Sequence, residues 1–194
     1  IDKVMGLNWN GGAISTGKFG GVYLFDLLED QDINLYNLNN LNQNYHIQFI
    51  GYDEPFDGSV LLNGNIDLLN NTMLSYEMNS EELQPDHGFP MRAVVPGYTG
   101  AKNIKWLKEI KISKEESKSS WQKGVAYKSF GPSIKSFENI TEKDKLETPT
   151  VEKLPVQSFI CNTDIQKEDD NEYIFIEGIA YSGGGNNIIR VDVS

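Results

Sequence analysis

The sequence predicts a mixed α+β fold with more strand than helix. Apolar residues make up 39% of the 194-residue chain, which is enough for one ordinary core. One segment spaces its apolar residues as a helix does, whereas several short apolar runs are separated by Gly, Pro, Asp and Asn, as strands are. These two observations favour short strands over long helices.

The predicted helix covers Val22 to Asp30, where Leu24, Leu27 and Leu28 recur at helical spacing after Gly20-Gly21. These leucines are expected to pack into the core. The asparagine-rich stretch that follows, Asn34 to Asn44, is expected to form a polar surface loop.

Four strands are predicted in the middle of the chain. The alternation Ile110-Lys111-Ile112 indicates that the last of them has one buried face and one wet face. The four segments are His46 to Gly51, Met73 to Met78, Met91 to Val95 and Ile104 to Ser113.

The last third of the chain combines polar segments with further predicted strands. Lys114 to Ser120 is expected to be solvated, and Ser133 to Val151 lacks periodicity and is a candidate linker. A strand is expected over Val156 to Cys161. Tyr173 to Tyr181 and Ile188 to Val193 are predicted to form a hairpin around Ser182-Gly183-Gly184-Gly185. Because two strands alone are marginally stable, we expect a natural domain to continue beyond Ser194.

Charge and cysteine content exclude several classes of function. The formal net charge is -11, with 28 acidic and 17 basic residues, which argues against a nucleic-acid partner. No apolar run approaches the roughly 20 residues of a membrane helix. The lone Cys161 cannot form an internal disulfide, and with only two histidines a self-contained metal site is not expected. Cys161 is interpreted as a buried apolar residue.

Residues Asp86 to Leu107, DHGFPMRAVVPGYTGAKNIKWL, carry the densest group of chemically informative residues. Arg92 offers a planar fork for phosphate oxygens, and Lys105 adds a point charge. Gly88, Gly97 and Gly100 would let the backbone approach a ligand closely. An anion site and a purely structural set of strand ends are both compatible with these residues, and Lys102 and Lys108 are expected to be solvated.

This block is similar to the molybdopterin-binding segment of eukaryotic sulfite oxidases and assimilatory nitrate reductases. Other blocks resemble the same family in the same order along the chain. They are GLNWNGGAIST (6–16), LSYEMN (74–79), SSWQKGVAYKSFGPS (119–133), LPVQSFI (154–160) and GIAYSGGGNNIIRVDVS (178–194).

The resemblance implies two parts. Residues 1–150 would be the C-terminal portion of an α+β molybdopterin-binding oxidoreductase domain. Residues 151–194 would open an immunoglobulin-like dimerisation domain. The cysteine that binds molybdenum in the family would lie before Ile1, so no metal ligand is assigned here. These 194 residues by themselves are expected to contain no stoichiometric molybdenum, to be inactive towards sulfite and to aggregate.

The resemblance also implies which residues contact the molybdenum-molybdopterin cofactor. His87, Arg92 and the run Asn103-Ile104-Lys105 would contact the pterin and its phosphate, and Asp53 would accept hydrogen bonds from the pterin ring. The structural alternatives are a capping or core role for His87 and a turn role for Asp53.

Two further residues are implied to act near the substrate. Trp9 would wall the oxyanion pocket, unless it is a core tryptophan. Tyr127 would donate its hydroxyl beside the metal and control approach and proton-coupled electron flow, unless it is a buried ring with a satisfied hydroxyl.

The tyrosine loop favours sulfite as the substrate, because Lys128-Ser129-Phe130-Gly131-Pro132 follows the sulfite oxidase pattern. The alternatives are nitrate reduction on the same scaffold and a non-catalytic remnant. The resemblance implies a homodimer and an electron acceptor that is a haem protein or dioxygen, with haem possible in a domain outside this chain. Family members occur in mitochondria and in peroxisomes.

Overall fold

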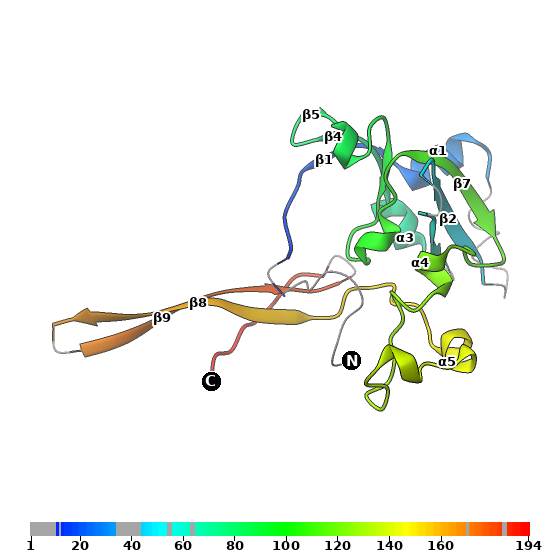
Figure 1. The fold of residues 1–194 in the computed structure, drawn as a ribbon. Coiled ribbons are helices and arrows are strands. Elements are labelled where there is room, and N and C mark those ends of the chain that lie inside the picture. The colour runs from blue at the N-terminus through cyan, green and yellow to red at the C-terminus, as the bar shows by residue number, and fades with distance from the viewer. Residues whose placement is uncertain are drawn as a thin grey trace.

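The computed structural model describes residues 11, 13–33, 44–53, 56–62, 65–169, 171–183 and 186–194. Most helices and strands before residue 124 form one body, and a long two-stranded ribbon projects from it (Figure 1). Strand residues outnumber helical residues in the described part of the chain, as the sequence predicted. None of the described helices is both long enough and apolar enough to cross a membrane.

One sheet is built around β4 (Met73–Met78), which pairs antiparallel with three other strands. Two short helices lie beside this sheet, and contribute the buried Leu24, Leu28, Leu68 and Leu69 to the core. The partner strands are β1 (Phe19–Tyr23), β5 (Glu81–Glu82) and β6 (Arg92–Val94), and the helices are α1 (Leu24–Asp30) and α3 (Ile66–Asn71).

The predicted start of the first helix was wrong. Val22 and Tyr23 belong to β1 and pair with Leu74 and Met73 of β4, and the helix begins at Leu24. The apolar run continues through the junction, so its spacing alone did not reveal where the strand ends.

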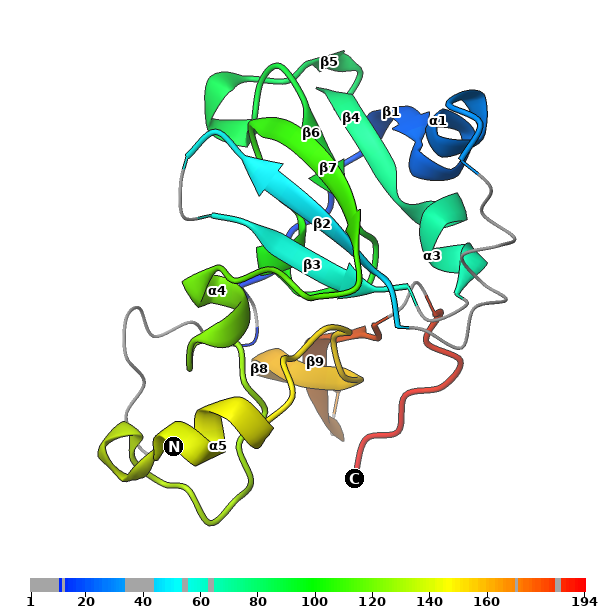
Figure 2. The same ribbon diagram turned by 90° about the vertical axis from the view of Figure 1, so that its right-hand side faces the viewer.

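The second sheet has the order β3-β2-β7 and is entirely antiparallel (Figure 2). Buried and half-buried positions alternate along its central strand, β2 (His46–Gly51), so that Ile47 and Phe49 point into the core and are fully buried. Its neighbours are β3 (Gly58–Leu61) and β7 (Leu107–Ser113). The predicted strands at 46–51 and 73–78 are confirmed, and those at 91–95 and 104–113 are present in shortened form.

Two 3₁₀ turns and a short helix connect these sheets to the site described below. They are η1 (Pro85–His87), η2 (Gly100–Lys102) and α4 (Ser120–Lys123). Gly88 ends η1 at a φ of +106°, and a Cβ there would lie 2.9 Å from the Cβ of Lys105. This glycine therefore allows η1 to approach the 105–106 segment.

The segment predicted as a linker, 133–151, contains regular structure. It holds η3 (Phe137–Asn139) and α5 (Glu142–Glu147). Thr141 caps α5 by accepting from the Asp144 backbone N–H, while the Asp144 carboxylate accepts from the Thr141 N–H. This reciprocal capping box stabilises a helix too short and polar to show periodicity.

The projecting ribbon consists of β8 (Gln157–Glu168) and β9 (Asn171–Tyr181), which pair antiparallel from Gln157↔Tyr181 to Glu168↔Asn171. The predicted pairing of Tyr173–Tyr181 with Ile188–Val193 was wrong, since β9 pairs with β8 and the described residues 186–194 form no strand. A ladder along the whole of β8 satisfies more backbone groups than pairing with six residues would.

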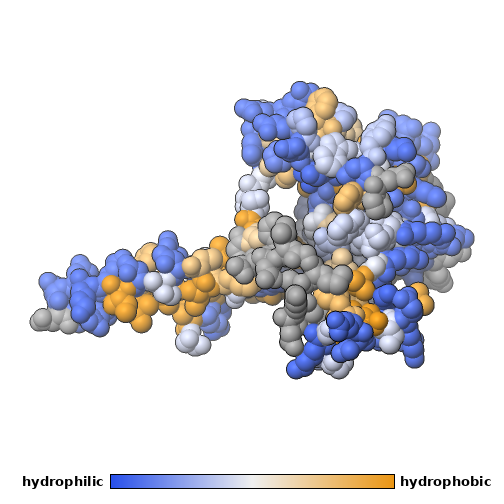
Figure 3. Space-filling model, in the orientation of Figure 1, coloured by the Kyte–Doolittle hydropathy of each residue, from blue (hydrophilic) through white to orange (hydrophobic). Residues whose placement is uncertain are grey.

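Cys161 is exposed, which corrects the prediction that it is buried. It lies on β8, where none of the described elements forms a second layer over the ribbon, and most side chains of both strands are exposed. Apolar residues are exposed here as well, including Ile160, Ile165 and Ile174, and orange atoms follow the ribbon in Figure 3.

Candidate functional site

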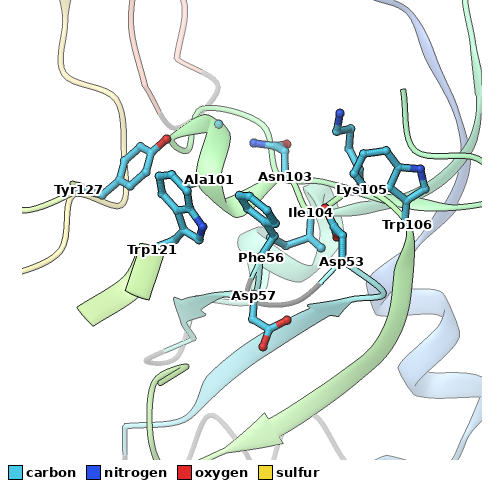
Figure 4. Close-up of a pocket in the computed structure, with 11 residues that line it drawn as sticks. Asp53, Phe56, Asp57, Ala101, Asn103, Ile104, Lys105, Trp106, Trp121 and Tyr127 are labelled. Carbon is cyan, nitrogen blue, oxygen red and sulfur yellow. The ribbon is translucent and has the colours of Figure 1, made fainter. Parts of the chain in front are cut away.

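A cavity of about 410 Å³ lies where three segments meet (Figure 4). The first segment follows β2, the second runs from η2 towards β7, and the third runs from α4 to Tyr127. The lining residues are Asp53, Phe56, Asp57, Gly100, Ala101, Asn103, Ile104, Lys105, Trp106, Trp121 and Tyr127. The volume is within the range of pockets that hold small molecules and cofactors.

Aromatic rings form one wall of this cavity. Phe56 stacks on Trp121 with ring centroids 5.3 Å apart, and Trp121 meets Tyr127 at 5.9 Å with the rings tilted by 59°. In Figure 4 the lining residues extend from Tyr127 at one end of the cavity to Lys105 and Trp106 at the other. Such a wall suits a flat, partly apolar ligand.

Asp53 brings an unpaired carboxylate oxygen to the cavity. Its Oδ1 is buried and has no hydrogen-bond partner among the described residues. A Cβ at Gly51 would lie 2.8 Å from this oxygen, so the glycine makes room for the carboxylate. Because a buried acceptor without a donor is costly, this oxygen is poised to accept from a ligand N–H or O–H.

Lys105 and Trp106 are fixed by the turn η1. The Lys105 ammonium donates to the Asp86 carbonyl over 2.8 Å and lies 4.4 Å from the Trp106 ring centroid. The Trp106 indole N–H donates to the Pro85 carbonyl over 2.9 Å, and its backbone φ is +50°. A left-handed conformation is unusual for a bulky residue, and here it turns the chain at the cavity wall.

Asn103 and Ile104 line the cavity while they hold its backbone together. The Asn103 Oδ1 accepts from the Val95 N–H over 2.7 Å, and its Nδ2 donates to the Thr99 carbonyl over 3.2 Å. Ile104 is 7% exposed and belongs to the core cluster.

Arg92 and His87 lie close to the cavity residues but do not line it. The Arg92 guanidinium donates to the carbonyls of His87 (3.0 Å) and Asn103 (3.3 Å) and lies 5.3 Å from the Phe19 ring centroid. Its Nε–H is buried without a partner among the described residues, and burial lowers the pKa of the guanidinium. In this arrangement Arg92 ties η1 to the cavity wall and keeps one donor free.

The cavity therefore gathers five of the eight residues that the resemblance assigned to the cofactor or the substrate: Asp53, Asn103, Ile104, Lys105 and Tyr127. His87 and Arg92 do not line the cavity, but Arg92 donates to the carbonyl of the lining residue Asn103 and to that of His87. Trp9 lies outside the described residues. Phe56, Trp106 and Trp121 were not singled out, although each is an aromatic residue within three positions of a predicted contact or inside a block that resembled the family.

Lys102 was expected to be solvated, and this was wrong. Its side chain is 1% exposed and donates to the Gln122 side-chain oxygen, beside α4. Burial lowers the pKa of Lys102 from its ordinary value of 10.5 to about 8, against the opposing effect of Glu152 and Glu116. A lysine can be buried here because its ammonium finds an acceptor and nearby carboxylates. Lys108 is exposed, as expected.

No cluster of three or more His, Cys, Asp or Glu side chains that could hold a metal ion occurs within the described part of the chain. The polar side chains around the cavity fit an organic group with ring N–H donors and an anionic end. Asp53 would accept from the ring, and Lys105 would face the anion.

Comparison with known proteins identifies the class of domain that carries this cavity. Residues 1–121 match the oxidoreductase molybdopterin binding domain, and residues 148–194 match the Mo-co oxidoreductase dimerisation domain. The arrangement is thus that of a pterin-binding α+β oxidoreductase domain followed by an assembly domain. The chain belongs to the oxidoreductase molybdopterin binding domain family.

Individual relatives agree with this assignment. The mitochondrial sulfite oxidase of Homo sapiens is 38% identical over the whole of this chain, which covers 35% of that protein. A nitrate reductase [NADPH] of Mycosarcoma maydis is 30% identical over the whole chain, which covers 22% of it. The chain spans about a third of the length of the sulfite oxidases of Drosophila melanogaster and Homo sapiens.

A solved structure shows the same fold. The sulfane dehydrogenase SoxCD from Paracoccus pantotrophus aligns with a TM-score of 0.58 and 20% identity, over 85% of this chain and 38% of that one. The predicted order of an α+β molybdopterin-binding domain and a dimerisation domain is confirmed.

Proposed function

We propose that this chain forms part of a sulfite-oxidising enzyme and that its cavity holds the pterin of a molybdenum-molybdopterin cofactor. The observation that carries the proposal is the unpaired, buried Asp53 oxygen in a cavity lined by aromatic rings and Lys105. The two family matches and the sulfite oxidase relatives support it. Residues 1–150 would supply cofactor contacts, and residues 151–194 would begin the dimerisation domain.

The residues around the cavity contact different parts of the cofactor. Asp53 accepts from the pterin ring, and Lys105 together with the Asn103–Ile104 backbone lies at the phosphate end. Arg92 and His87 act from behind: Arg92 offers its free Nε–H to the phosphate, while its other donors fix Asn103 and His87 in place. When bound, the cofactor supplies two-electron oxygen-atom transfer chemistry.

The reaction converts sulfite and water into sulfate, two protons and two electrons. The Tyr127 hydroxyl donates a hydrogen bond to an oxygen of the anion and so orients the anion. The Phe56–Trp121 stack beside Tyr127 limits access of water. Trp9 would wall the substrate site. Because the chain as a whole is strongly acidic, the anion needs local positive charge such as that of Lys105.

Sulfite is favoured over nitrate by two observations. The loop Lys128–Pro132 has the sulfite oxidase pattern, and identity to the human sulfite oxidase exceeds identity to the nitrate reductase. Nitrate reduction on the same scaffold is the second candidate, because the nitrate reductase also aligns along the whole chain.

Assembly and location follow the same reasoning. The dimerisation-domain match and the exposed apolar side chains of β8 and β9 support a homodimer. The mitochondrial sulfite oxidases among the relatives favour a mitochondrial location. A haem protein or dioxygen would accept the electrons.

Steady-state turnover tests this function. The protein expressed from its complete reading frame should reduce an electron-accepting dye when sulfite is added, and should not oxidise a reduced dye when nitrate is added. Nitrate turnover without sulfite turnover would replace the first candidate with the second. Neither activity in protein that contains stoichiometric cofactor would refute both.

A further inference from the structure

Lys102 and Gln122 form a buried pair that joins the two walls of the cavity. Lys102 ends the turn η2, next to the lining residues Ala101 and Asn103, and Gln122 lies in α4, next to Trp121. Each side chain is 1% exposed, and the Lys102 ammonium donates to the Gln122 Oε1. The two residues do not line the cavity themselves.

Gln122 is held from several directions. Its Oε1 also accepts from the Ser59 N–H of β3 over 3.3 Å, and its Nε2 donates to the Glu116 carboxylate over 3.0 Å. Its backbone carbonyl accepts from the Thr150 hydroxyl over 2.9 Å. Gln122 therefore fixes α4 to β3 and to Lys102. Through Thr150 it also fixes α4 to the segment beside Tyr127, because the Tyr127 carbonyl accepts from the Val151 N–H.

The charged groups that act on Lys102 come from several segments of the chain. Glu116 and Glu152 favour its protonated form, Lys128 opposes it, and His46 on β2 is itself affected by Lys102 and Glu116. Glu152 is held by the Leu61 N–H over 3.3 Å, and burial raises its pKa. Lys123 pairs with Glu116 over 3.8 Å at the rim. Burying an ammonium in this position is costly, and the hydrogen bond to Gln122 and the nearby carboxylates offset only part of that cost, since its pKa stays lowered.

We infer that the Lys102–Gln122 pair is a positioning device that sets the separation between the Asn103–Trp106 wall and the Trp121–Tyr127 wall. Lys102 is a positioning residue, since it acts through Gln122 on Trp121. The inference deepens the proposed function and rests on it for the identity of the ligand.

The lowered pKa of Lys102 allows its positioning role to be measured at Trp121, because a buried lysine that does not act on Trp121 would titrate without changing the environment of that ring. As pH rises through about 8, Lys102 loses its proton, and the charged hydrogen bond to Gln122 becomes a weaker neutral one. The environment of Trp121 should then change. An arginine at position 102 stays charged throughout this range and still donates.

The experiment uses 5-fluorotryptophan-labelled protein from the complete reading frame, with the Trp121 resonance assigned by its loss in Trp121→Phe. We expect the wild-type Trp121 ¹⁹F shift to titrate with a midpoint of about 8. The titration should be absent in Lys102→Arg and in Lys102→Met and retained in Lys108→Met, a matched change of an exposed lysine. A Trp121 shift that titrates unchanged in Lys102→Met, or not at all in wild type, would overturn the inference.

Turnover supplies the second measurement. Lys102→Met should lower kcat/KM for sulfite by about 10- to 100-fold, as expected when a supporting residue lets a site loosen. Lys102→Arg should retain most of the wild-type kcat/KM, and its melting temperature should equal that of Lys102→Met. Equal losses in the two variants would show that only packing matters. Absent turnover in all proteins, with the ¹⁹F result intact, would refute the sulfite function and leave the positioning role standing.

Discussion

The buried Lys102 should make folding stability depend on pH in a way that one substitution removes. Its pKa is about 8 in the folded protein, against an ordinary value of 10.5. Between these values the unfolded chain binds more protons than the folded one, so the contribution of Lys102 to the free energy of unfolding rises with pH. The difference between the two pKa values corresponds to about 3 kcal/mol in the free energy of unfolding. About 1 kcal/mol of it is gained between pH 7 and pH 9.

The assay compares urea unfolding of wild type, Lys102→Met and Lys108→Met at pH 7 and pH 9. Methionine fills similar space but carries no proton, so the wild-type free energy of unfolding should gain about 1 kcal/mol on Lys102→Met as pH rises. Wild type and Lys108→Met should show no such divergence. If the difference between wild type and Lys102→Met is the same at both pH values, Lys102 is not the titrating buried ammonium described here.

Further changes test the core, the connecting segment and the site. Phe49→Ala removes a fully buried ring from the central strand β2 and should cost about 3–5 kcal/mol in chemical unfolding; a cost below 1 kcal/mol would contradict its place in the core. Thr141→Ala removes the cap of α5 and should cost about 1 kcal/mol of local stability, seen as faster proteolysis at 142–147 with unchanged cofactor content. Tyr127→Phe keeps the ring and removes the hydroxyl, so it should slow sulfite turnover while the melting temperature stays within a degree or so; an equal loss of stability would assign Tyr127 to the core.

Periodicity and turn chemistry were sufficient where an element has one clear face. The strand at His46–Gly51 was predicted with its observed bounds, because it is a short apolar run that ends at a glycine. The same approach failed at Val22–Tyr23, where one apolar run spans the end of a strand and the start of a helix. The sequence signal for α5 was present in Thr141 and Asp144, which have the spacing of a capping box.

Long-range partners account for the remaining differences. Nothing local marks Lys102 as buried, because its partner Gln122 is twenty residues away. Cys161 was expected to be buried because a free cysteine packs as a small apolar residue, but β8 pairs only with β9 and has no covering layer among the described residues. Asp53, Tyr127 and the Asn103–Lys105 run could be anticipated as cavity residues from the resemblance, but the aromatic wall from Phe56 and Trp121 could not, since it depends on tertiary packing.

The central claim is that the cavity holds the pterin and that Asp53 accepts from its ring. The most direct measurement is the pterin released on denaturing purified protein from the complete reading frame, quantified by fluorescence for wild type, Asp53→Asn and Asp67→Asn, an exposed control in α3. Loss of a charged acceptor worth about 1.5–3 kcal/mol weakens binding by about 10- to 100-fold. We predict about one pterin per wild-type and Asp67→Asn chain and a large loss in folded Asp53→Asn, whereas full pterin content in Asp53→Asn, or none in wild type, would contradict the account.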